Sequence, residues 1–98
     1  MEGLEELTEL QDLHLAENQI SMVEGLGTLV KLRSIFLGAN EFNSVDSVAG
    51  LVDCPAMASI DLRDNKLDAE DGYLELFSKM PNLSNLYLKG TQLYMKTK

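Results

Sequence analysis

The sequence predicts an α/β fold: a right-handed solenoid with a short parallel β-sheet on its concave face and 3₁₀-helical or α-helical return segments on its convex face. Two observations lead to this prediction. One apolar motif occurs four times, and its four copies align with one another without gaps. The segments between the copies have apolar residues at every third or fourth position. Because copies repeated at about 20 to 50 residues bury their apolar sides by stacking on one another, such repetition indicates a solenoid.

The four copies of the motif predict the strands. They lie 22, 25 and 26 residues apart and begin at Leu10, Leu32, Met57 and Leu83. Each copy contains two apolar residues separated by one other residue, which puts both side chains on the same face of a short strand. We therefore predict four strands, near residues 13–15, 35–37, 60–62 and 86–88.

An asparagine follows the predicted strand in three of the four copies, at Asn18, Asn40 and Asn65. A buried Asn side chain can satisfy the backbone groups that are exposed where the chain turns. We predict that these three residues form a structural ladder along the solenoid. In the fourth copy Thr91 takes this position and has no amide with which to continue the ladder.

The return segments differ in their apolar spacing. Residues 20–32 and 42–57 have an apolar residue at every third position, which is typical of 3₁₀ turns. The third return has helical spacing and is followed by Pro81. We predict an α-helix between Ala69 and Lys79, with Asp68 as its N-cap.

The chain length of 98 residues suits one domain, residues 1–98. Residues 1–10 match residues 23–32, so the domain contains about three and a half repeats. We expect it to lack a complete cap at each end.

Residues 1–30 contain seven acidic residues and no Lys or Arg, whereas residues 77–98 contain four Lys and no acid. Uncapped ends of opposite charge predict head-to-tail self-association, or covering of the ends by a neighbouring protein.

Composition argues against several classes of function. The net charge of −8 disfavours nucleic-acid and anionic-membrane partners, and no apolar stretch is long enough to span a membrane. The single cysteine, Cys54, excludes an internal disulfide and indicates a reducing, intracellular compartment. Since His14 is the only histidine and no set of acid, base, nucleophile or metal ligands converges, we expect no catalytic residue, cofactor or metal site.

The strand side chains that point away from the core form the predicted protein-binding site on the concave face. Phe36 and Tyr87 stand out there, because an aromatic residue at a solvent-facing position fills no core. The residues predicted for this site are Asp12, His14, Ser34, Phe36, Asp61, Arg63, Asn85, Tyr87 and Lys89.

The repeated motif resembles that of leucine-rich-repeat proteins. The first return is similar to the 22-residue SDS22-like unit of intracellular members. Residues 51–67 (LVDCPAMASIDLRDNKL) and 80–91 (MPNLSNLYLKGT) resemble the dynein axonemal assembly factor 1 family. This resemblance implies a non-catalytic cytoplasmic or ciliary scaffold for axonemal dynein assembly, with dynein subunits or assembly chaperones as partners. The alternatives are an SDS22-like phosphatase regulatory subunit and a leucine-rich axonemal dynein light chain.

Overall fold

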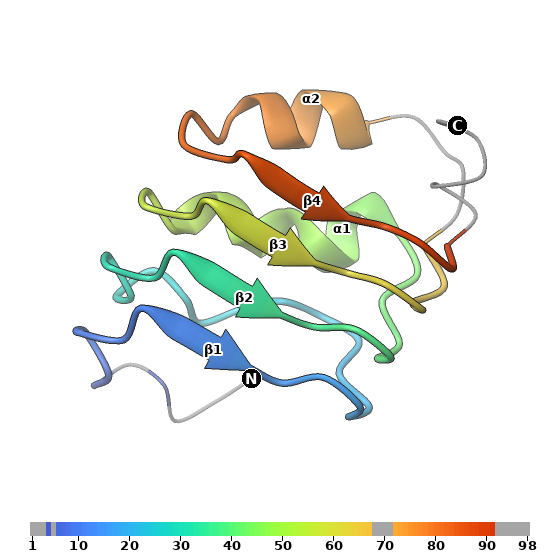
Figure 1. The fold of residues 1–98 in the computed structure, drawn as a ribbon, viewed down its shortest axis with the longest axis horizontal. Helices are drawn as coiled ribbons and strands as arrows, with labels where there is room; N and C mark the ends of the chain where they lie inside the picture. Colours follow the sequence, from blue (N-terminus) through green and yellow to red (C-terminus); the bar gives the residue numbers. More distant parts are fainter. Residues whose placement is uncertain (1–3, 5, 68–71, 92–98) are drawn as a thin grey trace.

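The strands form one parallel sheet in a computed structural model that describes residues 4, 6–67 and 72–91. The sheet has four strands in the order β1-β2-β3-β4, and each consecutive pair is parallel. In Figure 1 the strands lie side by side from β1 at the bottom to β4 at the top, with the second return behind the sheet. The strands are β1 (Asp12–His14), β2 (Ser34–Phe36), β3 (Ser59–Asp61) and β4 (Asn85–Tyr87).

Each strand begins and ends one residue earlier than the sequence indicated. The ladder is already paired before the apolar pair, since the amide of Ser34 donates to the carbonyl of Gln11 over 3.1 Å. The predicted direction of the side chains is unaffected, because Leu13 and Ile35 are buried whereas His14 is exposed. The predicted bounds that this corrects are residues 13–15, 35–37, 60–62 and 86–88.

The core lies between the sheet and the return segments. Leu37, Ile60 and Leu62, from the apolar pairs of the strands, have no exposed surface, and neither do Phe42 and Leu51 from the second repeat's turn and return. Fully burying one such side chain is worth about 1.5–3 kcal/mol. The repeated apolar pattern is therefore what holds the coils of the solenoid together.

The first two returns have different local structure. In the first, the described backbone forms separate three-residue turns. The amide of Leu29 donates to the carbonyl of Leu26, and the amide of Leu32 donates to the carbonyl of Leu29. The second contains a short α-helix, α1 (Val45–Val48), followed by the 3₁₀ helix η1 (Ala49–Asp53). The expected 3₁₀ geometry thus occurs in the second half of this return.

A reciprocal cap explains why the second return starts as an α-helix. The Ser44 side chain accepts a hydrogen bond from the Ser47 amide, and the Ser47 hydroxyl accepts one from the Ser44 amide. These bonds satisfy donors that a helix otherwise leaves unpaired in its first turn. The three-residue apolar spacing does not reveal this cap.

The third return contains the helix α2 (Tyr73–Ser78), which is shorter than the predicted 69–79. Gly72 takes the N-cap position with a φ of 108°, a left-handed conformation that glycine adopts without a steric cost. The predicted N-cap, Asp68, lies outside the described residues. Among the described helices, none is long and apolar enough to cross a membrane.

The turn after each strand passes through the left-handed region of the backbone. The residue before each ladder position has a positive φ: 61° at Glu17, 56° at Ala39, 59° at Asp64 and 86° at Gly90. Only the last of these is a glycine, so three residues with side chains hold a conformation that costs roughly 1–2 kcal/mol each. The same turn is therefore built four times from four different residue types.

Candidate protein-binding face

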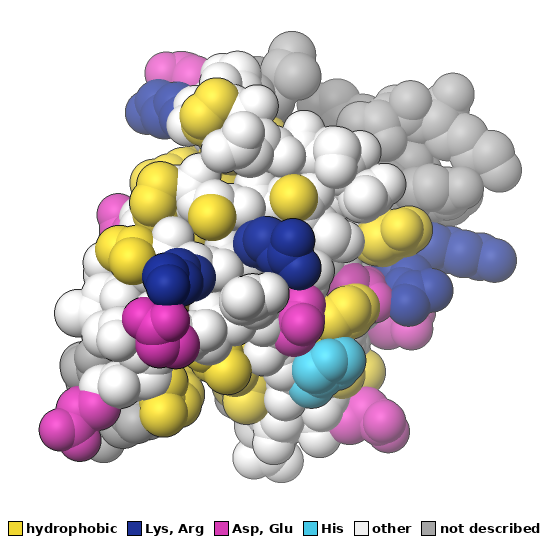
Figure 2. Space-filling model, turned by 60° about the vertical axis from the view of Figure 1, so that its left-hand side comes forward, with side chains coloured by type: hydrophobic (Ala, Val, Ile, Leu, Met, Phe, Trp, Pro, Cys, Tyr) yellow, Lys and Arg dark blue, Asp and Glu magenta, His cyan; other side chains and the backbone are white. Residues whose placement is uncertain are grey.

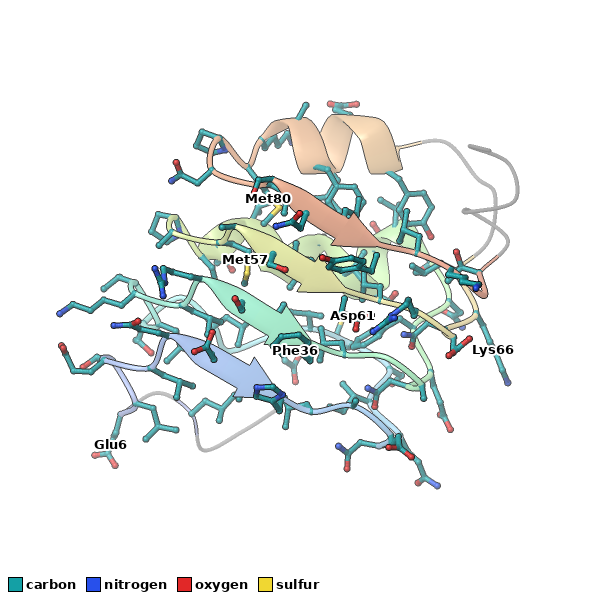
Figure 3. All side chains as sticks on the ribbon, viewed as in Figure 1. Glu6, Phe36, Met57, Asp61, Lys66 and Met80 are labelled. Atoms are coloured by element: carbon teal, nitrogen blue, oxygen red, sulfur yellow. The ribbon has the colours of Figure 1, made fainter. Side chains whose placement is uncertain are left out.

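The outward-pointing side chains of the four strands form two rows across the sheet, and we call these rows the sheet face. The parallel register places equivalent residues on neighbouring strands, which lie about 4.8 Å apart. Figure 3 shows two of them, Phe36 on β2 and Asp61 on β3. The first row is Asp12, Ser34, Ser59 and Asn85; the second is His14, Phe36, Asp61 and Tyr87.

Two aromatic rings stack at the β1 end of the second row. The ring centroids of His14 and Phe36 are 4.3 Å apart, and their planes differ by 14°. Figure 2 shows the imidazole of this only histidine in cyan, next to hydrophobic and acidic side chains. Phe36 points away from the core, but stacking against His14 covers part of its ring, so the residue is half-buried. One face of the sheet therefore carries a fixed apolar surface.

An ion pair between the buried Asp61 and the exposed Arg63 lies in the middle of the row. Asp61 is only 6% exposed, and it accepts two hydrogen bonds from the Arg63 side chain: Nε to Oδ1 at 3.0 Å and Nη2 to Oδ2 at 2.7 Å. The Arg63 amide also donates to Oδ1 over 3.0 Å. Burial raises the pKa of Asp61, but the hydrogen bonds and positive charge of Arg63 outweigh it, so this pKa lies below its ordinary value. The carboxylate is therefore ionised at neutral pH.

The same arginine joins β3 to the aromatic residue on β4. The Arg63 guanidinium carbon lies 5.6 Å from the centroid of the Tyr87 ring, within the range of a cation–π contact. Tyr87 remains 45% exposed. Three residues predicted for the binding site, Asp61, Arg63 and Tyr87, thus form one contacting cluster.

The four remaining predicted residues lie on β1, on β2, on β4 and in the segment after β4. Asp12 and Lys89 are exposed, Ser34 is half-buried, and the Asn85 side-chain amide donates to the hydroxyl of Ser84 over 3.4 Å. Gly38 takes the position after β2 that Arg63 takes after β3, and an added Cβ there would lie 3.3 Å from the Arg63 carbonyl oxygen. Both Gly38 and Arg63 lie two residues beyond the end of their strands.

Asn65 connects the backbone turns of two neighbouring repeats below the sheet face. Its side-chain nitrogen donates to the carbonyls of Leu37 and Leu62 at 2.9 and 3.1 Å, and its oxygen accepts from the amide of Phe42 at 3.2 Å. Asn40 makes the equivalent bonds one repeat earlier, to Leu15, Leu37 and the amide of Ile20. Both side chains therefore tie a repeat to the one before it.

The first and last positions of the ladder differ from the middle two. Asn18 is exposed, and its amide nitrogen donates to carbonyls of its own turn, Leu15 at 2.8 Å and Ala16 at 3.2 Å. Thr91 is buried, and its hydroxyl donates to the Leu88 carbonyl over 2.7 Å. The threonine hydroxyl thus reproduces the bond that each asparagine makes three residues back.

Cys54 is placed for packing. Its thiol is buried in the second return and lies 3.8 Å from the Leu26 carbonyl oxygen. Burial, together with the charge of Asp53, raises the pKa of Cys54 to about 11, so the thiolate needed for nucleophilic chemistry is scarce at neutral pH. Within the described part of the chain, no group of three or more His, Cys, Asp or Glu residues is arranged to hold a metal ion.

Comparison with known proteins identifies the fold. No protein-family model matches the chain, and the search of curated proteins gives no match. Among solved structures, the crystal structure of an internalin C2 from Listeria monocytogenes is similar, with a TM-score of 0.74 and 28% sequence identity. The alignment covers 91% of this chain but 36% of that chain, so this chain spans about a third of the internalin's length. The predicted fold class is confirmed: the chain has the leucine-rich-repeat fold, with a parallel four-stranded sheet and short helical returns.

Proposed function

We propose that the chain is a non-catalytic scaffold that binds another protein through the sheet face. Leucine-rich-repeat proteins are commonly protein-interaction scaffolds. The observation that carries the proposal is the second row of the sheet face, where the His14–Phe36 stack and the Arg63–Tyr87 contact lie on neighbouring strands. Aromatic residues and arginine are the side chains that most often supply the energy of protein association.

The sheet face also favours binding because its side chains are already ordered. The Arg63 guanidinium is held by Asp61 at two atoms, and the Phe36 ring is held by His14. Association costs about 0.5–1.5 kcal/mol for each long side chain that becomes fixed. A partner that docks on this face avoids much of that cost.

The resemblance to the dynein axonemal assembly factor 1 family supports a more specific role. The two segments that carry it, residues 51–67 and 80–91, include β3 and β4 and hence Asp61, Arg63 and Tyr87. We therefore propose a cytoplasmic or ciliary factor for axonemal dynein assembly, with dynein subunits or assembly chaperones as partners. The SDS22-like spacing of the first return supports the second candidate, a phosphatase regulatory subunit.

Affinity capture from an extract of ciliated cells tests both proposals. The immobilised chain is compared with the Phe36→Ala/Tyr87→Ala variant, and captured proteins are identified by mass spectrometry. The matched control is Met22→Ala/Val30→Ala, because these side chains are 45% and 52% exposed but lie outside the strands. We expect dynein heavy chains or chaperones on the wild type and on the control, and their loss from the sheet-face variant.

The other outcomes decide between the candidates. A phosphatase catalytic subunit that shows the same dependence on Phe36 and Tyr87 would favour the SDS22-like role. If every captured protein stays bound to the Phe36→Ala/Tyr87→Ala variant, the sheet face is not the binding surface.

A further inference from the structure

One edge of the Arg63 guanidinium has no partner among the described residues. A guanidinium carries five N–H donors in a planar fork. Asp61 accepts from Nε and from one N–H of Nη2, along the side edge of the fork, and leaves unused the end edge that is formed by Nη1 and the second N–H of Nη2. The Arg63 side chain is 53% exposed, so this second edge is accessible from outside the sheet face.

The strand segments beside Arg63 add no side chain on one side and a second cation on the other. Gly38 occupies the neighbouring position after β2 and contributes no side chain. Lys89 lies on the other side. The amide of Leu62 donates to the carbonyl of Tyr87, and the amide of Asp64 donates to the carbonyl of Lys89. These two bonds pair the segment around Arg63 with the segment that carries Lys89. Lys89 is exposed. The two cations therefore project from adjacent strand ends.

Two acidic residues act on Arg63, and neither fills the unused edge. Asp61 is bound along the side edge, and Asp64 is an exposed residue that attracts the guanidinium but forms no ion pair with it among the described residues. Moreover, the Asp64 carboxylate lies toward Gly90, because a Cβ added to that glycine would meet its oxygen Oδ1 first. An incoming carboxylate can thus take the position that these acids leave open.

We infer that Arg63 and Lys89 form a receptor for a carboxylate on the partner, from an Asp or Glu that adjoins an apolar residue. The carboxylate accepts two hydrogen bonds from the free edge of Arg63, while the apolar neighbour packs on the exposed ring of Tyr87 beside it. This inference rests on the proposed function, because it names the chemistry of the segment that the sheet face binds. The site suits a single carboxylate better than a polyanion, since Asp61, Asp64 and the net charge of −8 repel dense negative charge.

Selection of short random peptides displayed on phage, with the folded chain as bait, tests the inference. We expect the wild type to enrich peptides with an Asp or Glu beside an aromatic or aliphatic residue. For the best peptide, Arg63→Gln should weaken binding about tenfold or more, since hydrogen bonds between charged groups contribute that much. Changing the acidic peptide residue to its amide should weaken binding to the wild type by the same factor. The same peptide change should have little effect on binding to the Arg63→Gln variant.

Three further variants separate binding from folding. Arg63→Gln leaves the Asp61 carboxylate buried and unpaired, so Asp61→Asn/Arg63→Gln is included to remove both charges together. This double variant should remain folded and bind as weakly as Arg63→Gln. Arg63→Lys keeps the charge without the fork and should recover only part of the affinity. The control, Arg33→Gln, changes an exposed arginine outside the cluster and should bind like the wild type.

The outcomes distinguish this inference from the proposal beneath it. If the enriched peptides lack acidic residues, and are released by Phe36→Ala/Tyr87→Ala but not by Arg63→Gln, the carboxylate receptor is wrong and the sheet face still binds protein. If no enriched peptide depends on Phe36, Tyr87 or Arg63, the sheet face is not a binding surface and both fail.

Discussion

The Arg63 guanidinium covers the Asp61 carboxylate, with Nη2 only 2.7 Å from Oδ2. Asp61 ends β3 and Arg63 follows two residues later, so their side chains leave the extended backbone on the same side. Asp61 points away from the core, yet it is buried by this contact. The pair therefore couples the stability of β3 to the presentation of Arg63 on the sheet face.

The pair makes stability depend on pH in a predictable direction. The pKa of Asp61 is lowered on folding, so its contribution is fully present above its ordinary pKa of 3.8 and is lost as the pH falls through the lower folded value. We expect the stability advantage of the wild type over Asp61→Asn to shrink progressively below about pH 5. Urea unfolding of both proteins from neutral to acidic pH measures this. A difference that stays constant with pH would contradict the ionised pair.

The asparagine ladder predicts unequal effects of one substitution at two repeat positions. Asn65→Ala should lower the free energy of unfolding by about 2–4 kcal/mol, because it leaves the Leu37 and Leu62 carbonyls and the Phe42 amide without their buried partner. Asn18→Ala, at the exposed position, should cost less than about 1 kcal/mol. Denaturant titration gives both values, and equal losses would rule out this difference in role.

The left-handed turns predict that glycine stabilises one position and destabilises another. Ala39 has a φ of 56°, so Ala39→Gly should relieve backbone strain and raise stability by up to about 1 kcal/mol. Ala49 begins η1 with a φ of −62°, and Ala49→Gly should lower stability by roughly 0.5–1 kcal/mol. Thermal melts of the two variants should shift in opposite directions. A lower melting temperature for Ala39→Gly would show that this turn is not strained.

The register of the repeats is tested in the core. Leu62 has no exposed surface, so Leu62→Ala should cost about 2–5 kcal/mol through lost burial and a cavity. Val30→Ala, at a side chain that is 52% exposed, should change stability by less than about 0.5 kcal/mol. An unchanged melting temperature for Leu62→Ala would mean that the second residue of the apolar pair does not face the core.

Periodicity was sufficient to predict the fold and the two sides of the sheet. The spacing of Leu13, Ile35, Ile60 and Leu86 predicts four strands of one orientation, because only that placement buries all the copies together. Strand bounds were one residue late because backbone pairing starts before the apolar pair, as the Ser34–Gln11 bond shows. Hydrophobic pattern reports burial and not where hydrogen bonding begins.

Interactions between neighbouring strands were not visible in the sequence. The pattern marks Asp61 as solvent-facing, but the Arg63 side chain folds back over its carboxylate and buries it. Likewise the His14–Phe36 stack joins residues 22 positions apart, which the register alone brings together. The candidate site was therefore predicted as a set of positions, whereas its contacts required the structure.

The central claim is that the sheet face is the binding surface, and it is tested most directly by the affinity of a captured partner for matched variants. Isothermal titration would compare the wild type, Phe36→Ala/Tyr87→Ala and the control Met22→Ala/Val30→Ala, with melting curves to show that each is folded. We predict that the sheet-face variant loses on the order of 1–2 kcal/mol of binding free energy while the control binds like the wild type. Equal dissociation constants for the wild type and the folded sheet-face variant would contradict the claim.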